Sequence, residues 1–157
     1  MTEAHNHSQA RRRILPPTYL LIAIVVMVAL RFLLPALRLI RFPWTLLGLL
    51  PAVPGVVLNL LADQAFKRHQ TTVKPFEKST ALVTAGPYAL SRHPMYLGFT
   101  LMLLGIAILL GALTPFIVVP IFALALEYVF IRTEEPMMQE TFGHAWQAYK
   151  TNVRRWI

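Results

Sequence analysis

The chain has 157 residues, which is enough for one domain but not for separate cofactor and substrate domains. Hydrophobic residues make up 56% of it and charged residues 14%, a composition that disfavours a water-soluble monomer. Lys and Arg outnumber Asp and Glu by 15 to 7, a balance found in nucleic-acid-binding proteins and in membrane proteins. The absence of cysteine excludes disulfides, Cys-ligated metals and a thiol nucleophile.

The N-terminal half predicts two membrane helices, since a span needs about 20 mostly apolar residues. A basic N-terminus, 1–13, which we expect to be disordered, precedes the first predicted span, 14–34. Arg31 is the single charge in that span, and its long side chain can reach towards the interface. The second predicted span, 42–66, contains two prolines that should kink it.

The C-terminal half begins with a longer apolar stretch. Residues 94–126 run for 33 positions without a charge, too many for one helix across about 30 Å of hydrocarbon. We therefore predict a tight hairpin of two helices over 94–131, turning at Gly111–Pro115. The polar segments are a loop, 67–93, and a tail, 132–157, whose apolar residues recur at the spacing of an amphipathic helix.

Basic residues are distributed unevenly between the two sides of this arrangement. Twelve lie in the N-terminus, the central loop and the tail, whereas the other side has only Arg31, Arg38 and Arg41. By the positive-inside rule, both termini, the loop and any active site beside them are cytoplasmic, and we expect an integral protein of the bacterial inner membrane. Nucleic acid is disfavoured as a partner, because the charge is spread over three segments and forms no single patch.

The predicted fold class is therefore an all-α integral membrane protein. A single domain, 1–157, has about four transmembrane helices, the last two forming a tight hairpin, and a cytoplasmic C-terminal amphipathic helix. The sequence makes no prediction of oligomeric state. It predicts no metal site, because His5 and His7 have no carboxylate or thiolate partner.

One polar cluster lies directly before the hairpin. Arg92 and His93 precede Pro94, which suits the first turn of a helix, and the free N–H groups of that turn favour an anion. Tyr88 and Tyr96 add aromatic faces, which attract cations. The same residues would also be expected if they only anchored the helix at the level of the lipid headgroups.

A second cluster is acidic and follows the hairpin. Glu127 falls in an apolar run, where an ionisable group is costly and is a functional candidate, or else makes a structural hydrogen bond to a neighbouring helix. Glu134 and Glu135 also suit the first turn of a new helix, where acids complement the helix dipole. If one helix continues through Arg132, Glu127 and Glu134 share a face.

The hairpin would return both clusters to the same membrane face. An anion-binding helix entrance, aromatic faces and carboxylates together suit a zwitterionic cofactor with a carboxylate, a cationic centre and a ribose diol. No GxGxxG motif is present, so a soluble dinucleotide-binding fold is not supported.

Several motifs in order make the C-terminal half recognisable. The chain resembles the isoprenylcysteine carboxyl methyltransferase and phospholipid methyltransferase superfamily of integral membrane enzymes. The resemblance rests on motifs that run from near Thr71 to the end: Leu82-Val-Thr-Ala-Gly-Pro-Tyr88, Ser91-Arg-His-Pro-Met-Tyr-Leu-Gly98, Glu134-Glu-Pro-Met-Met138, Phe142-Gly143, Trp146-x-x-Tyr149 and Val153-Arg-Arg-Trp-Ile157.

The resemblance implies S-adenosylmethionine as the methyl donor, bound at the cytoplasmic face. The residues that match the family's motifs, or lie beside them, are the expected cofactor contacts. They are Tyr88, His93, Tyr96, Glu134, Glu135, Tyr149 and Arg155. The chain departs from the commoner pattern at Met138, where leucine is more frequent, and at Ala145-Trp146, where Glu-Tyr is more frequent.

The expected reaction is methyl transfer to a lipophilic or lipid-like acceptor through a carboxyl, amine or thiol group. A carboxylate acceptor needs no base, and Arg92 could hold it by a bidentate pair. An amine or thiol acceptor needs a general base, and Glu127, Glu134 and His93 are the candidates. Arg92 and Glu127 are accordingly the predicted catalytic residues, and the alternative is a noncatalytic membrane scaffold or subunit that keeps the fold.

Overall fold

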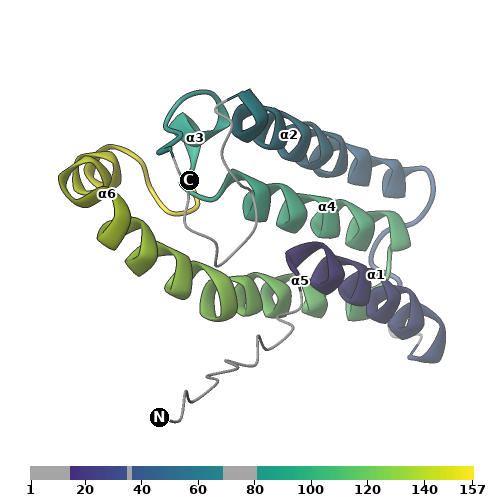
Figure 1. The fold of residues 1–157 in the computed structure, drawn as a ribbon. Helices are drawn as coiled ribbons and strands as arrows, with labels where there is room; N and C mark the ends of the chain where they lie inside the picture. Colours follow the sequence, from purple (N-terminus) through teal and green to yellow (C-terminus); the bar gives the residue numbers. More distant parts are fainter. Residues whose placement is uncertain (1–14, 35–36, 69–80) are drawn as a thin grey trace, which may run out of the picture.

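The computed structural model describes residues 15–34, 37–68 and 81–157, and within these ranges all repetitive structure is helical. Two pairs of helices pack side by side, α2 on α4 and α1 on α5, and the chain ends near the short helix α3 (Figure 1). In chain order the elements are α1 (Pro16–Leu33), the 3₁₀ helix η1 (Trp44–Gly48), α2 (Leu49–Arg68), α3 (Pro87–Leu90), α4 (Pro94–Leu110), α5 (Leu113–Leu126), the π-helical turn η2 (Glu127–Ile131) and α6 (Arg132–Asn152).

Three helical stretches in the described ranges are long and apolar enough to cross a membrane: Pro16–Leu33, Trp44–Arg68 and Leu113–Asn152. α4 is apolar but shorter, at 17 residues. Large apolar side chains such as Phe32, Leu50 and Ile121 point outwards, which is the arrangement expected of surfaces that face lipid. The predicted class, an all-α integral membrane protein, is confirmed.

Each predicted membrane span overlaps a helix of the structure. The span predicted at 14–34 is α1, and the one predicted at 42–66 is η1 followed by α2, which extends to Arg68. The predicted loop contains the short helix α3 near its end. The predictions for 1–13, including its histidines, and for residues 69–80 of the loop lie outside the described residues.

Gly111 makes the predicted hairpin turn tight. It ends α4 in the left-handed conformation (φ 66°), where glycine is favoured, and its N–H bonds to the carbonyls of the last helical turn. α5 begins at Leu113, so the break is shorter than the predicted Gly111–Pro115. Pro115 can stay within the first turn of α5, because N–H groups there have no helical acceptor to lose.

The same end of the bundle also fixes α1. The Arg31 side chain donates through Nε to the carbonyl of Leu110 at the end of α4, 3.1 Å away. The backbone N–H groups of Leu39 and Ile40 donate to the carbonyl of Gly111. Arg31 is thus held, near the C-terminal end of α1, by the backbone at the end of α4.

The predicted tail helix is a direct continuation of the hairpin. α5, η2 and α6 follow one another without a break, so residues 132–152 are not a separate element (Figure 1). α6 turns sharply at Gly143, which has a non-helical conformation (φ 50°, ψ −118°). After this kink, Trp146 and Tyr149 are buried, whereas the residues between them are exposed.

α2 and α4 approach closely because glycines face each other at two levels. A Cβ placed at Gly105 would lie 2.5 Å from the Cβ of Ala52 and 2.5 Å from the carbonyl oxygen of Gly48. One placed at Gly98 would lie 2.7 Å from the carbonyl oxygen of Gly55. Small residues at a helix contact let backbones pack closely within a membrane, where the hydrophobic effect does not drive helix association.

We expect Gly105→Ala to destabilise the protein by about 1–3 kcal/mol, because the added carbon must push α2 and α4 apart. This outweighs the roughly 1 kcal/mol by which alanine favours a helix over glycine. The measurement is thermal unfolding in detergent. Val53→Leu, which also adds one carbon but on an outward-facing position of α2, is the matched control and should change little. An unchanged transition for Gly105→Ala would contradict the close packing.

Candidate functional site

The site forms where the chain enters α4. Ser91 ends α3 in an extended conformation, and His93 then precedes Pro94 at the first position of α4. The Ser91 hydroxyl accepts the N–H of His93 at 3.2 Å, and the Ser91 side chain is fully buried. This short connection holds Arg92 and His93 at the end of an apolar helix, as the sequence predicted.

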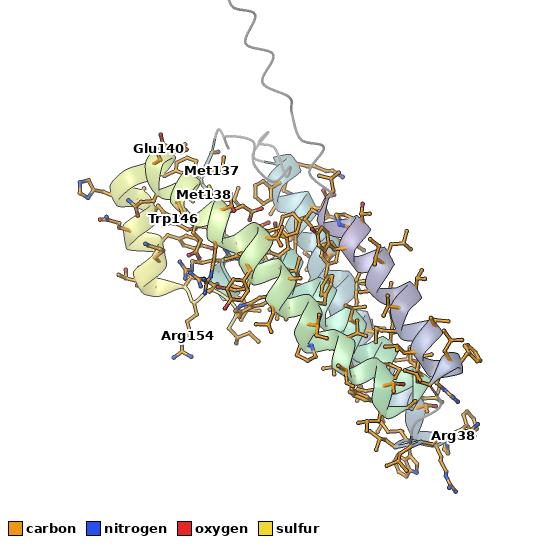
Figure 2. The ribbon with its side chains drawn as sticks, turned by 90° about the horizontal axis from the view of Figure 1, so that it is seen from below. Arg38, Met137, Met138, Glu140, Trp146 and Arg154 are labelled. Atoms are coloured by element: carbon orange, nitrogen blue, oxygen red, sulfur yellow. The ribbon has the colours of Figure 1, made fainter. Side chains whose placement is uncertain are left out.

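The C-terminal segment after α6 crosses this entrance. The backbone N–H of Arg92 donates to the carbonyl of Arg154, and the Ser91 hydroxyl donates to the carbonyl of Arg155, both at 3.0 Å. Trp156 packs against the main apolar core, whereas Arg154 points away from the molecule (Figure 2). The Arg155 side chain is thereby directed towards the carboxylates of α5–α6.

Arg155 links two of the three predicted carboxylates. Its Nε and Nη2 donate to the two oxygens of Glu135 at 3.1 and 2.5 Å, and its Nη1 donates to Glu127 Oε1 at 2.6 Å. Hydrogen bonding to Glu135 is the main cause that raises the pKa of Arg155, with Glu127 adding to it against a smaller opposing effect of burial. Arg155 therefore stays charged.

The prediction that Glu127 and Glu134 share a face is corrected. The helix does continue through Arg132, but η2 is a π-helical turn, which takes about one residue more than an α-helical turn. The extra residue shifts the register of the following helix by one residue. Glu135, eight positions after Glu127, therefore takes the place on the helix face that Glu134, seven positions after it, would otherwise have. Glu135 therefore joins Glu127 on Arg155, and Glu134 faces elsewhere.

Glu134 instead faces the start of α4. Its Oε1 accepts the hydroxyl of Tyr96 at 2.6 Å, and its Oε2 lies 3.6 Å from Nδ1 of His93. His93 Nε2 lies 3.5 Å from Glu135 Oε1, and the His93 ring stacks on Tyr96. Arg92 Nη1 contacts the same Glu135 oxygen at 3.1 Å. The structure thus brings Arg92, His93 and Tyr96 together with the acidic pair.

Two of the predicted cofactor contacts, Tyr88 and Tyr149, lie beside this cluster and connect the helices around it. The Tyr149 hydroxyl donates to the carbonyl of Tyr88 at 2.6 Å, which ties the end of α6 to α3. The Tyr88 ring packs edge-on against Phe66 of α2, with 5.1 Å between ring centroids. Burial raises the pKa of Tyr88, so its hydroxyl stays neutral.

Sequence reasoning did not single out Ser91 or Trp146 as site residues. Ser91 was visible only as part of a motif, and its role needs the C-terminal segment in place. Trp146 is 2% exposed and lies beneath the Arg92 guanidinium, whose Cζ is 5.9 Å from the ring centroid. Its helical spacing was the available signal, but spacing alone does not distinguish a site residue from a core residue.

Four buried polar atoms at this site make no hydrogen bond among the described residues. Two are donors, Nε of Arg92 and Nε1 of Trp146; Glu127 Oε2 is an acceptor; and Nε2 of His93 can be either. Buried atoms of this kind are rare and need an explanation. Free donors and free acceptors within one site fit a ligand that itself carries both charges, as a zwitterionic cofactor does. In the described ranges no group of three or more metal-ligating side chains is arranged to hold a metal ion.

Known proteins match the chain over this site. The phospholipid methyltransferase family matches residues 43–145. A curated Schizosaccharomyces pombe protein, protein-S-isoprenylcysteine O-methyltransferase, is 39% identical over 79 residues, which are 48% of this chain and 32% of the relative. A solved eukaryotic intramembrane Ras methyltransferase, isoprenylcysteine carboxyl methyltransferase, superposes with a TM-score of 0.63 at 27% identity, over 90% of this chain and 51% of that one.

The chain therefore spans about a third of the curated relative and about half of the solved protein. The match to the family covers well over half of the chain. It includes the polar cluster before α4 and the acidic cluster of Glu127, Glu134 and Glu135. These findings confirm the resemblance predicted from the motifs. The chain belongs to the phospholipid methyltransferase family.

Proposed function

We propose that the protein is a membrane-embedded methyltransferase that uses S-adenosylmethionine and acts on a lipophilic acceptor. The observation that carries this proposal is the meeting of Arg92 and His93, at the start of α4, with Glu134 and Glu135, at the start of α6. Their side chains are largely withdrawn from water at one end of an apolar bundle, which, in a chain of this family, supports a site that excludes water while remaining beside it.

The donor and acceptor atoms of the site suit the two charges and the ribose of the cofactor. Glu134 and the free oxygen of Glu127 would accept from an ammonium or from hydroxyls. Arg92 would hold a carboxylate, and the stacked rings of His93 and Tyr96 would offer an aromatic surface to a cationic centre. When bound, S-adenosylmethionine supplies an electrophilic methyl group. The protein's task is to align the acceptor with it and keep water away.

Among the possible acceptors, a carboxylate is the one that we propose, in preference to an amine or a thiol. Glu127 Oε1 is bonded to Arg155, Glu134 Oε1 accepts from Tyr96, and both ring nitrogens of His93 face carboxylates. One oxygen of Glu127 and one oxygen of Glu134 are thus already hydrogen-bonded within the site. A carboxylate acceptor needs no base. The curated relative's name, an isoprenylcysteine O-methyltransferase, points to the same acceptor chemistry.

The site lies at the cytoplasmic end of the bundle in this proposal. Glu140 and Trp146 lie at one end of the molecule and Arg38 at the other (Figure 2). The uneven distribution of basic residues orients the α6 end towards the cytoplasm by the positive-inside rule. The charged cofactor would then arrive from water, and the lipophilic acceptor from the membrane.

We expect the purified protein to bind S-adenosylmethionine and S-adenosylhomocysteine saturably in detergent, as measured by titration calorimetry. Glu134→Gln and His93→Ala should each weaken binding about tenfold or more, because each removes a charged or hydrogen-bonding contact worth about 1.5–3 kcal/mol. Glu140→Gln, an exposed position on the same helix, is the matched control and should bind like wild type. A folded wild type that binds neither compound would favour the noncatalytic scaffold.

With labelled S-adenosylmethionine, we expect methyl transfer to N-acetyl-S-farnesylcysteine, giving an ester that mild base releases. The carboxamide of the same compound, which differs only in lacking the carboxylate, should not be methylated. Phosphatidylethanolamine tests the amine alternative in parallel. Methylation of its amine, with none of the farnesylcysteine, would contradict the carboxylate assignment.

The absence of cysteine makes the orientation directly testable. In spheroplasts, a membrane-impermeant maleimide should label Arg38→Cys at once but Glu140→Cys only after the cells are broken. The unmodified chain gives the background, since it has no thiol. The reverse pattern would place the site on the outer side of the membrane.

A further inference from the structure

Trp146 carries a buried polar atom that the proposed cofactor contacts do not use. It follows the kink at Gly143 in α6, and its side chain is among the largest that are almost completely buried. Its Nε1–H has no acceptor among the described residues. A buried donor without a partner costs about 1–3 kcal/mol, so its persistence at a site points to a ligand that supplies the acceptor.

Arg92 presents a second such donor next to the indole. Its Nη1 is held by Glu135 at 3.1 Å, but its Nε–H is buried and has no acceptor in the part of the chain that the structure describes. The guanidinium lies over the Trp146 ring, with 5.9 Å between Cζ and the ring centroid. Two unpaired donors from different parts of the chain, one of them on a positive group, therefore lie on neighbouring side chains.

The indole is also fixed in place. The Trp146 and Tyr149 rings are in contact, with centroids 5.5 Å apart, and the Tyr149 hydroxyl is bonded to the carbonyl of Tyr88. Tyr88 in turn packs on Phe66. A donor held by such contacts is preorganised for a ligand, because little side-chain freedom remains to be lost on binding.

We propose that the Nε1–H of Trp146 and the Nε–H of Arg92 form a carboxylate-binding subsite. Both atoms are donors, so their ligand must offer acceptors, and the arginine favours one that is negatively charged. A carboxylate offers two oxygens to two donors. The inference rests on the proposed function, in which two molecules carry such a group: the amino-acid end of the methyl donor, and the acceptor.

The test compares two ligands with two forms of the protein. Trp146→Phe keeps an aromatic ring and removes the N–H. We expect it to weaken S-adenosylhomocysteine binding about tenfold by calorimetry and to leave unchanged the binding of the decarboxylated analogue, which lacks only the carboxylate. Trp44→Phe, at an exposed tryptophan of η1, is the control and should alter neither.

A second measurement needs no change at Trp146. In a protein whose other two tryptophans, Trp44 and Trp156, are replaced by phenylalanine, the single indole N–H resonance should move downfield with S-adenosylhomocysteine but not with its decarboxylated analogue. If that resonance responds instead to N-acetyl-S-farnesylcysteine, and Trp146→Phe raises only the KM for that compound, the carboxylate is the acceptor's. Either result supports the subsite and identifies its source.

Equal weakening of both nucleoside ligands by Trp146→Phe would overturn the inference, because the indole would then act through packing alone. An unchanged affinity for every carboxylate-bearing ligand, with no movement of the resonance, would overturn it as well. In both cases the wild type still binds the donor, so the proposed function stands. A folded wild type that binds no donor would overturn the proposed function and this inference together.

Discussion

The arrangement of this end of the molecule depends on the need to neutralise three carboxylates that are largely withdrawn from water. Glu127, Glu134 and Glu135 lie on one helix that emerges from an apolar span, where an unpaired charge is costly. Removing one partner of a fully buried ion pair costs about 3–5 kcal/mol, and less where one partner is exposed, as Arg155 partly is. Arg132 lies 3.9 Å from Glu127, and the closer arginine counterions are Arg155, on Glu127 and Glu135, and Arg92, on Glu135. Arg92 and Arg155 are distant in sequence from each other. The hairpin and the C-terminal segment are what bring them to the acids.

The π-helical turn η2 decides which carboxylate each counterion meets. In an uninterrupted α-helix Glu127 and Glu134 would lie on one side, and Arg155 would bridge these two. The turn shifts the register by one residue, so Arg155 binds Glu127 and Glu135 while Glu134 is released towards Tyr96 and His93. The same helix can therefore present one acid to the C-terminal segment and a second acid to α4. π-helical turns occur often at functional sites. Here the turn separates the partners of Glu134 from those of Glu127 and Glu135, which gives a physical reason for its presence.

Much of the fold could be predicted from the sequence because membrane spans depend on length and hydropathy, which are local properties. The hairpin followed from the charge-free run of 33 residues, and Gly111 marked its turn. Both polar clusters, and their meeting, followed from the same argument. Which acid pairs with which partner could not be predicted, because η2 has no sequence signature comparable to a proline or a glycine. The contact of Ser91 with Arg155 likewise depends on tertiary structure that no local pattern reports.

The family match ends at residue 145, but the site does not. Trp146, Tyr149 and Arg155 all follow that point, and they supply the buried indole, the brace on α3 and the link between two carboxylates. The matched region thus contains the start of α4 and the acidic pair, which together form only part of a charge-balanced cluster. The C-terminal residues complete it. Because a cluster of this kind tolerates a change only where the charges and hydrogen bonds remain matched, the segment after Gly143 is as necessary to the site as the matched region.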